Sequence, residues 1–199
     1  MTTRFVLLRH GTCAPTAERL LGRALDSPLD ERGAAEAQAA ARRLQALRPR
    51  RVETSPRLRT LQTAACVAEA AGCDLRVARA LDEVDFGRWA GRRFAELEGD
   101  PQWRTWNAHR ATAHTPAGDS MEDVRRRLCE HLERLAAVDP DSTLVLVTHA
   151  EPIRAAVLHA RGLGADRWDD VQIAPASVTT LLFEHGRLVL AGVNERVAA

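Results

Sequence analysis

Two segments far apart in the chain end in the same way. Residues 5–10 read Phe-Val-Leu-Leu-Arg-His, and residues 144–149 read Leu-Val-Leu-Val-Thr-His. Four consecutive apolar residues are typical of a strand that is buried on both faces, as in a parallel sheet between two layers of helices. If the two strands are parallel neighbours, both histidines lie at the edge where ligands bind in open α/β sheets.

The rest of the chain alternates between predicted strands and helices. Strands are expected at 4–9, 51–54, 75–77, 143–148, 178–183 and 188–193, and helices at 30–47, 55–72, 119–138 and 152–159. Asp30 and either Asp119 or Ser120 suit helix N-caps, Pro56 and Pro152 suit a first turn, and Gly72 suits a helix end. The fold class is therefore α/β: a three-layer sandwich with a mainly parallel central sheet covered by helices on both faces, and an antiparallel hairpin near the C-terminus.

Composition bounds the organisation and the partners of the chain. Its 199 residues fit one domain, 1–199, in which 81–118 reads as an insertion that covers the sheet near the active site. The 28 basic and 27 acidic side chains leave a charge of +1, so no overall field favours nucleic acid or a membrane surface. No apolar stretch approaches the roughly 20 residues of a membrane span. We therefore expect a cytoplasmic protein, with a homodimer left open.

The histidines and nearby arginines suggest phosphate chemistry. Guanidinium groups bind phosphate oxygens bidentately. Arg9 adjoins His10 at the end of one predicted strand, and Arg59 lies in the first turn of the helix that follows another. A neutral imidazole at His10 can attack phosphorus if its other ring nitrogen is held, for instance by a backbone carbonyl. The departing alkoxide needs a proton, and the residues alone leave Asp82, Glu83 and Asp85 as alternative donors.

Five segments together resemble the histidine phosphatase superfamily, the phosphoglycerate mutase-like proteins, over nearly the whole chain. They are Leu8-Arg9-His10-Gly11, residues 55–64, residues 81–91, residues 116–120 and Val147-Thr148-His149. The resemblance implies that His10 is the nucleophile, that Arg9, Arg59 and His149 form the phosphate pocket, that Glu83 is the proton donor, and that no metal or other cofactor takes part. Around them we expect substrate-binding positions at Thr16, Gly22, Arg23 and Ala150.

The predicted activity is metal-independent hydrolysis of a small-molecule phosphomonoester through a phosphohistidine. Because the acid segment is short for a mutase, the resemblance favours the phosphatase branch, with phosphoglycerate mutase-type transfer as the alternative. A metal hydrolase using both histidines is disfavoured by Arg9, which would repel a cation. A binding module on an inactive scaffold is disfavoured because the matched positions keep their chemistry. Residues 125–127, three arginines on a predicted helix, are interpreted as a solvated face. Trp103 and Trp106 are interpreted as core residues, with the lining of a substrate cleft as the alternative.

Overall fold

A six-stranded sheet in the order β3-β2-β4-β1-β5-β6 forms the centre of the molecule. The computed structural model describes residues 2–14 and 18–196. The strands are β1 (Thr3–Arg9), β2 (Arg51–Thr54), β3 (Asp74–Val77), β4 (Thr143–Thr148), β5 (Val178–Glu184) and β6 (Arg187–Glu195). The helices are α1 (Glu31–Leu44), α2 (Leu58–Ala71), α3 (Phe94–Leu97), α4 (Pro101–Ala108), α5 (Met121–Val138) and α6 (Ala150–Ala160), with 3-10 turns η2 (Gln45–Leu47), η3 (Arg79–Leu81), η4 (Gly87–Trp89) and η5 (Ala165–Asp170).

The predicted pairing of the two histidine-ended strands is confirmed. β1 and β4 are parallel neighbours, with Leu8 opposite Val147 and Arg9 opposite Thr148. β2 and β3 continue the parallel part, whereas β5 runs antiparallel to β1 and β6 antiparallel to β5. His185 and Gly186 join β5 to β6 with φ angles of 51° and 75°, as a tight hairpin turn requires. The fold class is the one expected from the sequence.

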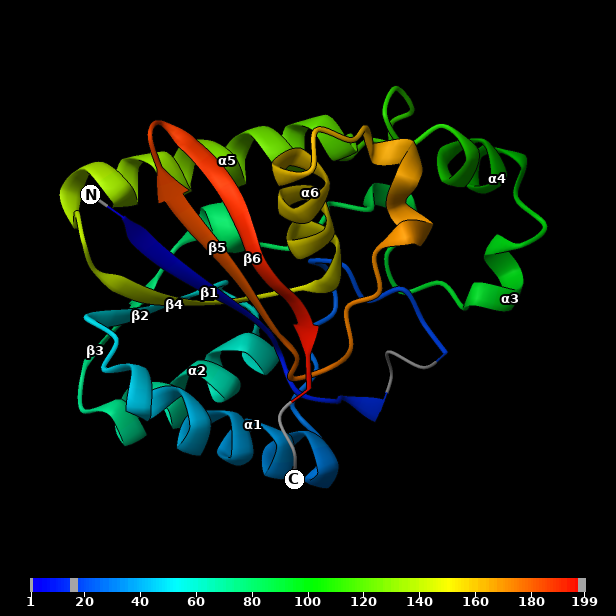
Figure 1. Ribbon diagram of the computed structural model, residues 1–199. Helices are drawn as coiled ribbons and strands as arrows, with labels where there is room; N and C mark the ends of the chain where they lie inside the picture. Colours follow the sequence, from blue (N-terminus) through cyan, green and yellow to red (C-terminus); the bar gives the residue numbers. More distant parts are fainter. Residues whose placement is uncertain (1, 15–17, 197–199) are drawn as a thin grey trace.

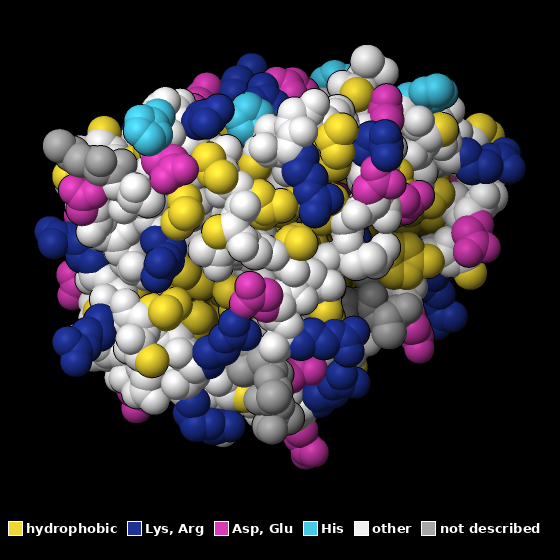
Figure 2. Space-filling model, in the orientation of Figure 1, with side chains coloured by type: hydrophobic (Ala, Val, Ile, Leu, Met, Phe, Trp, Pro, Cys, Tyr) yellow, Lys and Arg dark blue, Asp and Glu magenta, His cyan; other side chains and the backbone are white. Residues whose placement is uncertain are grey.

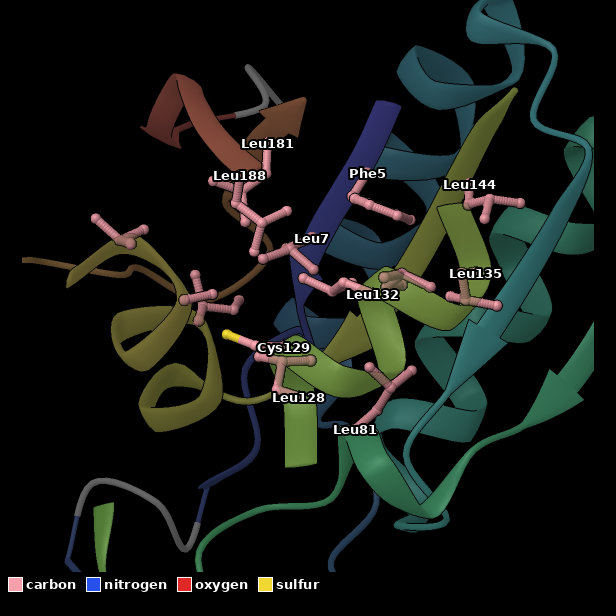
Figure 3. Packing of buried hydrophobic residues seen from close by; sticks show 14 of the residues in the cluster. Phe5, Leu7, Leu81, Leu128, Cys129, Leu132, Leu135, Leu144, Leu181 and Leu188 are labelled. Carbon is pink, nitrogen blue, oxygen red and sulfur yellow. The ribbon is translucent and has the colours of Figure 1, made fainter. Parts of the chain in front are cut away.

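Alternate residues of each apolar strand face different helical layers. Val6 and Leu8 pack with α1 and α2, while Phe5 and Leu7 pack with α5 and α6. Figure 1 shows the two pairs of helices on opposite sides of the sheet. Figure 3 shows Phe5 and Leu7 in the same buried cluster as Leu128 and Leu132 of α5, with Leu7 near Leu132. The need to fill both faces explains why these strands carry no polar alternation.

A third apolar cluster lies beside the sheet, where α3 and α4 are found (Figure 1). Phe86, Trp89 and Trp106 are its large buried members, and Trp106 is 1% exposed. Met121 and Val124 of α5 complete it. The interpretation of Trp106 as a core residue is therefore confirmed.

The start of α2 differs from the prediction. The helix begins at Leu58 with Arg57 as N-cap, so Pro56 precedes the helix instead of occupying its first turn. The reason is that the sheet pairing continues past β2, since the backbone N–H of Ser55 donates to the Val147 carbonyl at 3.0 Å. The chain is thus still extended where the sequence pattern alone predicted a helix.

Charges of both signs are interspersed on the face shown in Figure 2, in keeping with the net charge of +1. No helix among the described residues has the length and apolarity needed to cross a membrane.

Backbone contact between two glycines fixes the loop that follows His10. A Cβ on Gly33 would lie 1.9 Å from the Thr12 carbonyl oxygen, and one on Gly11 would lie 2.4 Å from the Gly33 carbonyl oxygen. The Asp30 N–H also donates to the Thr12 carbonyl at 3.1 Å. The first turn of α1 and the loop after His10 therefore approach so closely that no side chain fits between them.

We predict that Gly33→Ala forces this loop away from α1. The expected loss of unfolding free energy is about 1–3 kcal/mol, the usual cost of overpacking, measured by denaturant titration. Gly164→Ala is the control, because nothing lies within 4 Å of a Cβ placed there. Equal stability of the two variants would contradict the close approach.

Candidate active site

His10 and His149 immediately follow the paired strands β1 and β4. The His10 N–H donates to the Thr148 carbonyl at 3.1 Å, so the pairing extends one residue beyond the strands. The two imidazole centroids lie 5.3 Å apart, edge to face, and both side chains are buried. The structure thus brings together the two histidines that the sequence pattern placed at one edge.

The ring of His10 has a defined tautomer. Its Nδ1 lies 2.7 Å from the carbonyl oxygen of Gly11, and because a carbonyl can only accept, Nδ1 carries the proton. Nε2 then keeps its lone pair. Burial and the positive charges of Arg9 and Arg59 lower the pKa of His10 well below its usual value, so the ring is neutral near pH 7. A neutral imidazole held by a carbonyl is the arrangement that a nitrogen nucleophile requires.

Arg9 and Arg59 are the cations next to these rings. Arg59 is 1% exposed and donates through Nη2 to the Gly22 carbonyl at 3.0 Å and to His149 Nδ1 at 3.2 Å. Arg9 donates through Nη1 to the Ile173 carbonyl at 2.7 Å. Both Nε atoms are buried without a hydrogen-bond partner, and neither arginine forms an ion pair with a carboxylate, within residues 2–14 and 18–196. Two buried positive charges lacking a paired carboxylate are suited to an anionic ligand.

Glu83 supplies a carboxyl group beside the same rings. Its Oε1 accepts from the Val84 N–H at 3.0 Å, and its Oε2 lies 3.8 Å from Nδ1 of His149. Burial and the negative charge of Glu151 raise the pKa of Glu83 to about 7, against the opposing effects of the Val84 N–H and the two cations. The carboxyl can therefore exchange a proton at neutral pH, and Oε2 is the oxygen turned toward the histidine.

The other two carboxylates considered as proton donors have structural partners. Asp82 receives two hydrogen bonds from Arg57, at 3.0 and 2.9 Å, and one from the Glu83 N–H at 2.9 Å. Asp85 accepts from the Gly87 N–H at 3.0 Å within its own turn and is about half exposed. Asp82 Oδ1 also lies 4.0 Å from Nε2 of His149, but Asp82 is paired with Arg57. Of the three candidates, Glu83 is the one that lies beside the histidines without an arginine paired to its carboxyl group in the described part of the chain.

The predicted substrate-binding positions have mixed outcomes. Thr16 lies outside the described residues. The Gly22 carbonyl is engaged by Arg59, and Arg23 donates to the Glu83 carbonyl at 2.7 Å and to Asp119 at 2.6 Å, so both have structural partners. Ala150 is the first residue of α6, directly after His149. Their role in binding substrate remains a prediction.

The sequence pattern predicts a solvated face for Arg127, and for this residue the prediction is wrong. The guanidinium donates to the Ala80 carbonyl at 2.8 Å and to the Glu83 carbonyl at 2.9 Å. Together with Arg23, Arg127 holds the backbone carbonyl of Glu83 in place. Arg125 and Arg126 instead pair with carboxylates near the start of α5 and are more exposed.

A second group of charges lies near the site, and the partners of its carboxylate were not found from the sequence. Glu151, in the first turn of α6, pairs with Arg110 at 2.9 Å and with Arg154 at 2.5 Å. Arg110 lies between the rings of Trp106 and Trp168, 4.1 and 3.8 Å from their centroids. Although burial opposes its ionisation, the charges of Arg110 and Arg154 lower the pKa of Glu151. A fixed negative charge therefore stands near the titrating Glu83.

No group of three or more His, Cys, Asp or Glu side chains could hold a metal ion in the part of the chain that the structure describes. The ligand set of the metal hydrolase alternative is thus not assembled around His10 and His149.

Comparison with known proteins gives one consistent match. The family model of the histidine phosphatase superfamily (branch 1) matches residues 5–196. A probable phosphoglycerate mutase, GpmB, of Cronobacter sakazakii is 29% identical over 188 residues, which cover 94% of this chain and 87% of that protein. The mycobacterial glucosyl-3-phosphoglycerate phosphatase has a TM-score of 0.88 at 29% identity, covering 98% and 100% of the two chains. Its complex with inorganic phosphate has a TM-score of 0.86 at 30% identity, covering 98% of each chain.

We predict that Glu151→Gln lowers the pKa of Glu83, because it removes a negative charge that favours the protonated carboxyl. If Glu83 must be protonated to act, activity falls as the pH rises through its pKa. The high-pH limb of kcat/KM should then move to lower pH, by roughly half a pH unit or more for a neighbouring charge in a partly buried site. A pH profile of phosphomonoester hydrolysis for both proteins measures this shift of the high-pH limb.

Glu122→Gln is the matched control, since Glu122 also pairs with an arginine but lies on the exposed side of α5, where its side chain is 54% exposed. A limb that stays in place in Glu151→Gln, or moves to higher pH, would show that Glu151 does not act on Glu83.

Proposed function

We propose, since the chain belongs to the histidine phosphatase superfamily, that it is a phosphatase that hydrolyses small-molecule phosphomonoesters through a phosphohistidine on His10, without a metal ion. The observation that carries the proposal is the lone pair on Nε2 of His10. The Gly11 carbonyl holds the ring through Nδ1, and Arg9 and Arg59 flank it. Residues 1–199 act as one domain, and 81–118 cover the site.

The first step transfers the phosphoryl group. The lone pair of His10 Nε2 forms a bond to phosphorus while the bond from phosphorus to the ester oxygen breaks. Arg9, Arg59 and His149 bind the nonbridging oxygens, and Glu83 Oε2 gives its proton to the departing oxygen. Nδ1 of His10 keeps its proton throughout, so the phosphorylated ring is cationic and its N–H bond to the Gly11 carbonyl stabilises that charge.

The second step returns His10 to its starting state. The carboxylate of Glu83 takes a proton from water as the water oxygen attacks phosphorus. The bond between phosphorus and Nε2 breaks, and the electron pair returns to the ring. Inorganic phosphate leaves with Glu83 protonated and His10 neutral, so one ester and one water are consumed per cycle. A pKa of about 7 suits Glu83 to both directions of proton transfer.

Phosphoglycerate mutase-type transfer is the alternative, favoured by the similarity to GpmB. In that reaction the phosphoryl group returns from His10 to an organic hydroxyl instead of to water. Dependence of turnover on a bisphosphate primer, with little release of inorganic phosphate, would support the mutase. Release of phosphate without a primer would support the hydrolase, as the similarity to the glucosyl-3-phosphoglycerate phosphatase does.

We predict that His10→Ala loses hydrolysis by at least about a thousandfold, as expected when the attacking atom is removed. A panel of phosphomonoesters assayed with a chelator present measures this, with His185→Ala, an exposed histidine of the hairpin, as control. Rapid quenching with labelled substrate should leave on the wild-type protein a label that survives alkali and is lost in acid. Label on another residue, or activity abolished by the chelator, would contradict the mechanism.

We predict that the effect of Glu83→Gln depends on the leaving group. Alkyl phosphates, whose alkoxide must be protonated, should lose about 10²–10⁴-fold in kcat/KM, the usual contribution of a general acid. Aryl phosphates with acidic phenols should lose much less. An equal loss for both classes would place the proton donor elsewhere.

A further inference from the structure

His149 lies in the middle of a buried chain of polar groups. Arg59 Nη2 is 3.2 Å from its Nδ1, Ser55 Oγ is 2.8 Å from its Nε2, and Ser55 Oγ is 3.2 Å from Asp82 Oδ1. His149 and Ser55 are both 0% exposed. This series of hydrogen bonds therefore runs from the Arg59 cation to the Asp82 carboxylate, and its central groups have no contact with solvent.

Arg59 and Asp82, at the two ends of this series of hydrogen bonds, determine where each proton lies. A guanidinium can only donate, so Nδ1 of His149 accepts and carries a lone pair. The carboxylate of Asp82 can only accept, so the Ser55 hydroxyl donates to it and accepts from Nε2–H of His149. His149 is then neutral, with its one proton on Nε2.

This tautomer is unsuited to a bound phosphoryl group. Nδ1 is on the side of Arg59 and of Oε2 of Glu83, which is 3.8 Å away, and so faces the reaction site. A phosphate oxygen placed there would meet a lone pair instead of a donor. His149 can bind such an oxygen only if Nδ1 gains a proton.

The groups that face His149 explain why its protonation state can change. The charged and titratable groups around it are Arg9 at the end of β1, His10 directly after β1, Arg59 of α2, Arg127 of α5, and Asp82 and Glu83 of the segment after η3. Burial and the surrounding positive charges lower the pKa of His149 well below its usual value in the unliganded protein. A phosphoryl dianion would reverse the sign of the local field and favour the imidazolium form.

We infer that Ser55 and Asp82 are positioning residues that hold the proton of His149 on Nε2, so that binding of a phosphate dianion takes up a second proton on Nδ1. The inference rests on the proposed function, because it takes the space beside His10 to be a phosphate site. On binding, the hydrogen bond from Arg59 to Nδ1 breaks and Arg59 turns its N–H to a phosphate oxygen. The proton comes from solvent, and Nε2–H stays bonded to Ser55.

Nitrogen-15 NMR of histidine-labelled protein tests this directly, with inorganic phosphate as the probe at pH 8. The His149 signals are those lost in His149→Asn. Without phosphate we expect a protonated Nε2 and an unprotonated Nδ1, and with saturating phosphate both nitrogens protonated. Calorimetry in buffers of different ionisation enthalpy should show net proton uptake. Protonated Nδ1 in the free protein, or unprotonated Nδ1 in the complex, would overturn the inference.

Ser55→Ala should mix the two neutral tautomers and weaken phosphate binding about tenfold or more, the usual effect of losing a hydrogen bond to a charged group. Ser142→Ala is the matched control, because this serine bonds a backbone carbonyl at 2.7 Å near the other end of β4. Asp82→Asn, which keeps the shape of the side chain, should reduce the uptake of the second proton. Wild-type behaviour in both Ser55→Ala and Asp82→Asn would contradict the positioning role.

The outcomes separate this inference from the proposed function. If the protein hydrolyses phosphomonoesters while His149 stays neutral in the phosphate complex, the inference fails and the phosphatase stands. If phosphate does not bind and no ester is hydrolysed, the proposed function fails, and with it the proton uptake.

Discussion

The parallel pairing of β1 with β4 is the constraint from which the geometry of the site follows. Parallel strands in register end at the same level, so Arg9 opposite Thr148 places His10 next to His149 without any contribution from the loops. The pairing continues through the bond from the His10 N–H to the Thr148 carbonyl. Because both strands are buried under helices on each face, neither can shift by one residue without turning a full set of apolar side chains to the wrong layer.

The distribution of ion pairs then distinguishes the centre of the site from its surroundings. Arg57 and Arg110 each pair with a carboxylate, whereas Arg9 and Arg59 donate to backbone carbonyls and, for Arg59, to His149. Carbonyl partners satisfy N–H groups but do not cancel charge. The positive potential is thus concentrated at the two histidines, which agrees with a chain whose overall charge is close to zero.

The strands, the helices and the order in which they alternate could be predicted from the sequence, because these features depend on local patterns: apolar runs, caps and turn residues. The role of Arg127 was missed although a signal was present. Arg127 lies three residues after Val124, on the same helical stripe as the buried Leu128, and this spacing favours burial. The partners of Glu151 could not be found this way, because Arg110 and Trp168 belong to segments whose positions depend on long-range packing.

Glu83 has a tightly held backbone and a side chain with few bonds. Its carbonyl receives Arg23 and Arg127, at 2.7 and 2.9 Å, and its N–H donates to Asp82 at 2.9 Å. None of these bonds involves the carboxyl group, so a change in its protonation leaves them intact. A residue that must serve as acid in one step and base in the next benefits from this separation, because its position does not depend on its charge. Arg23 and Arg127 thus hold Glu83 through its backbone. The negative charge of Glu151 opposes the effect of Arg59 and Arg9 on the pKa of the Glu83 carboxyl group.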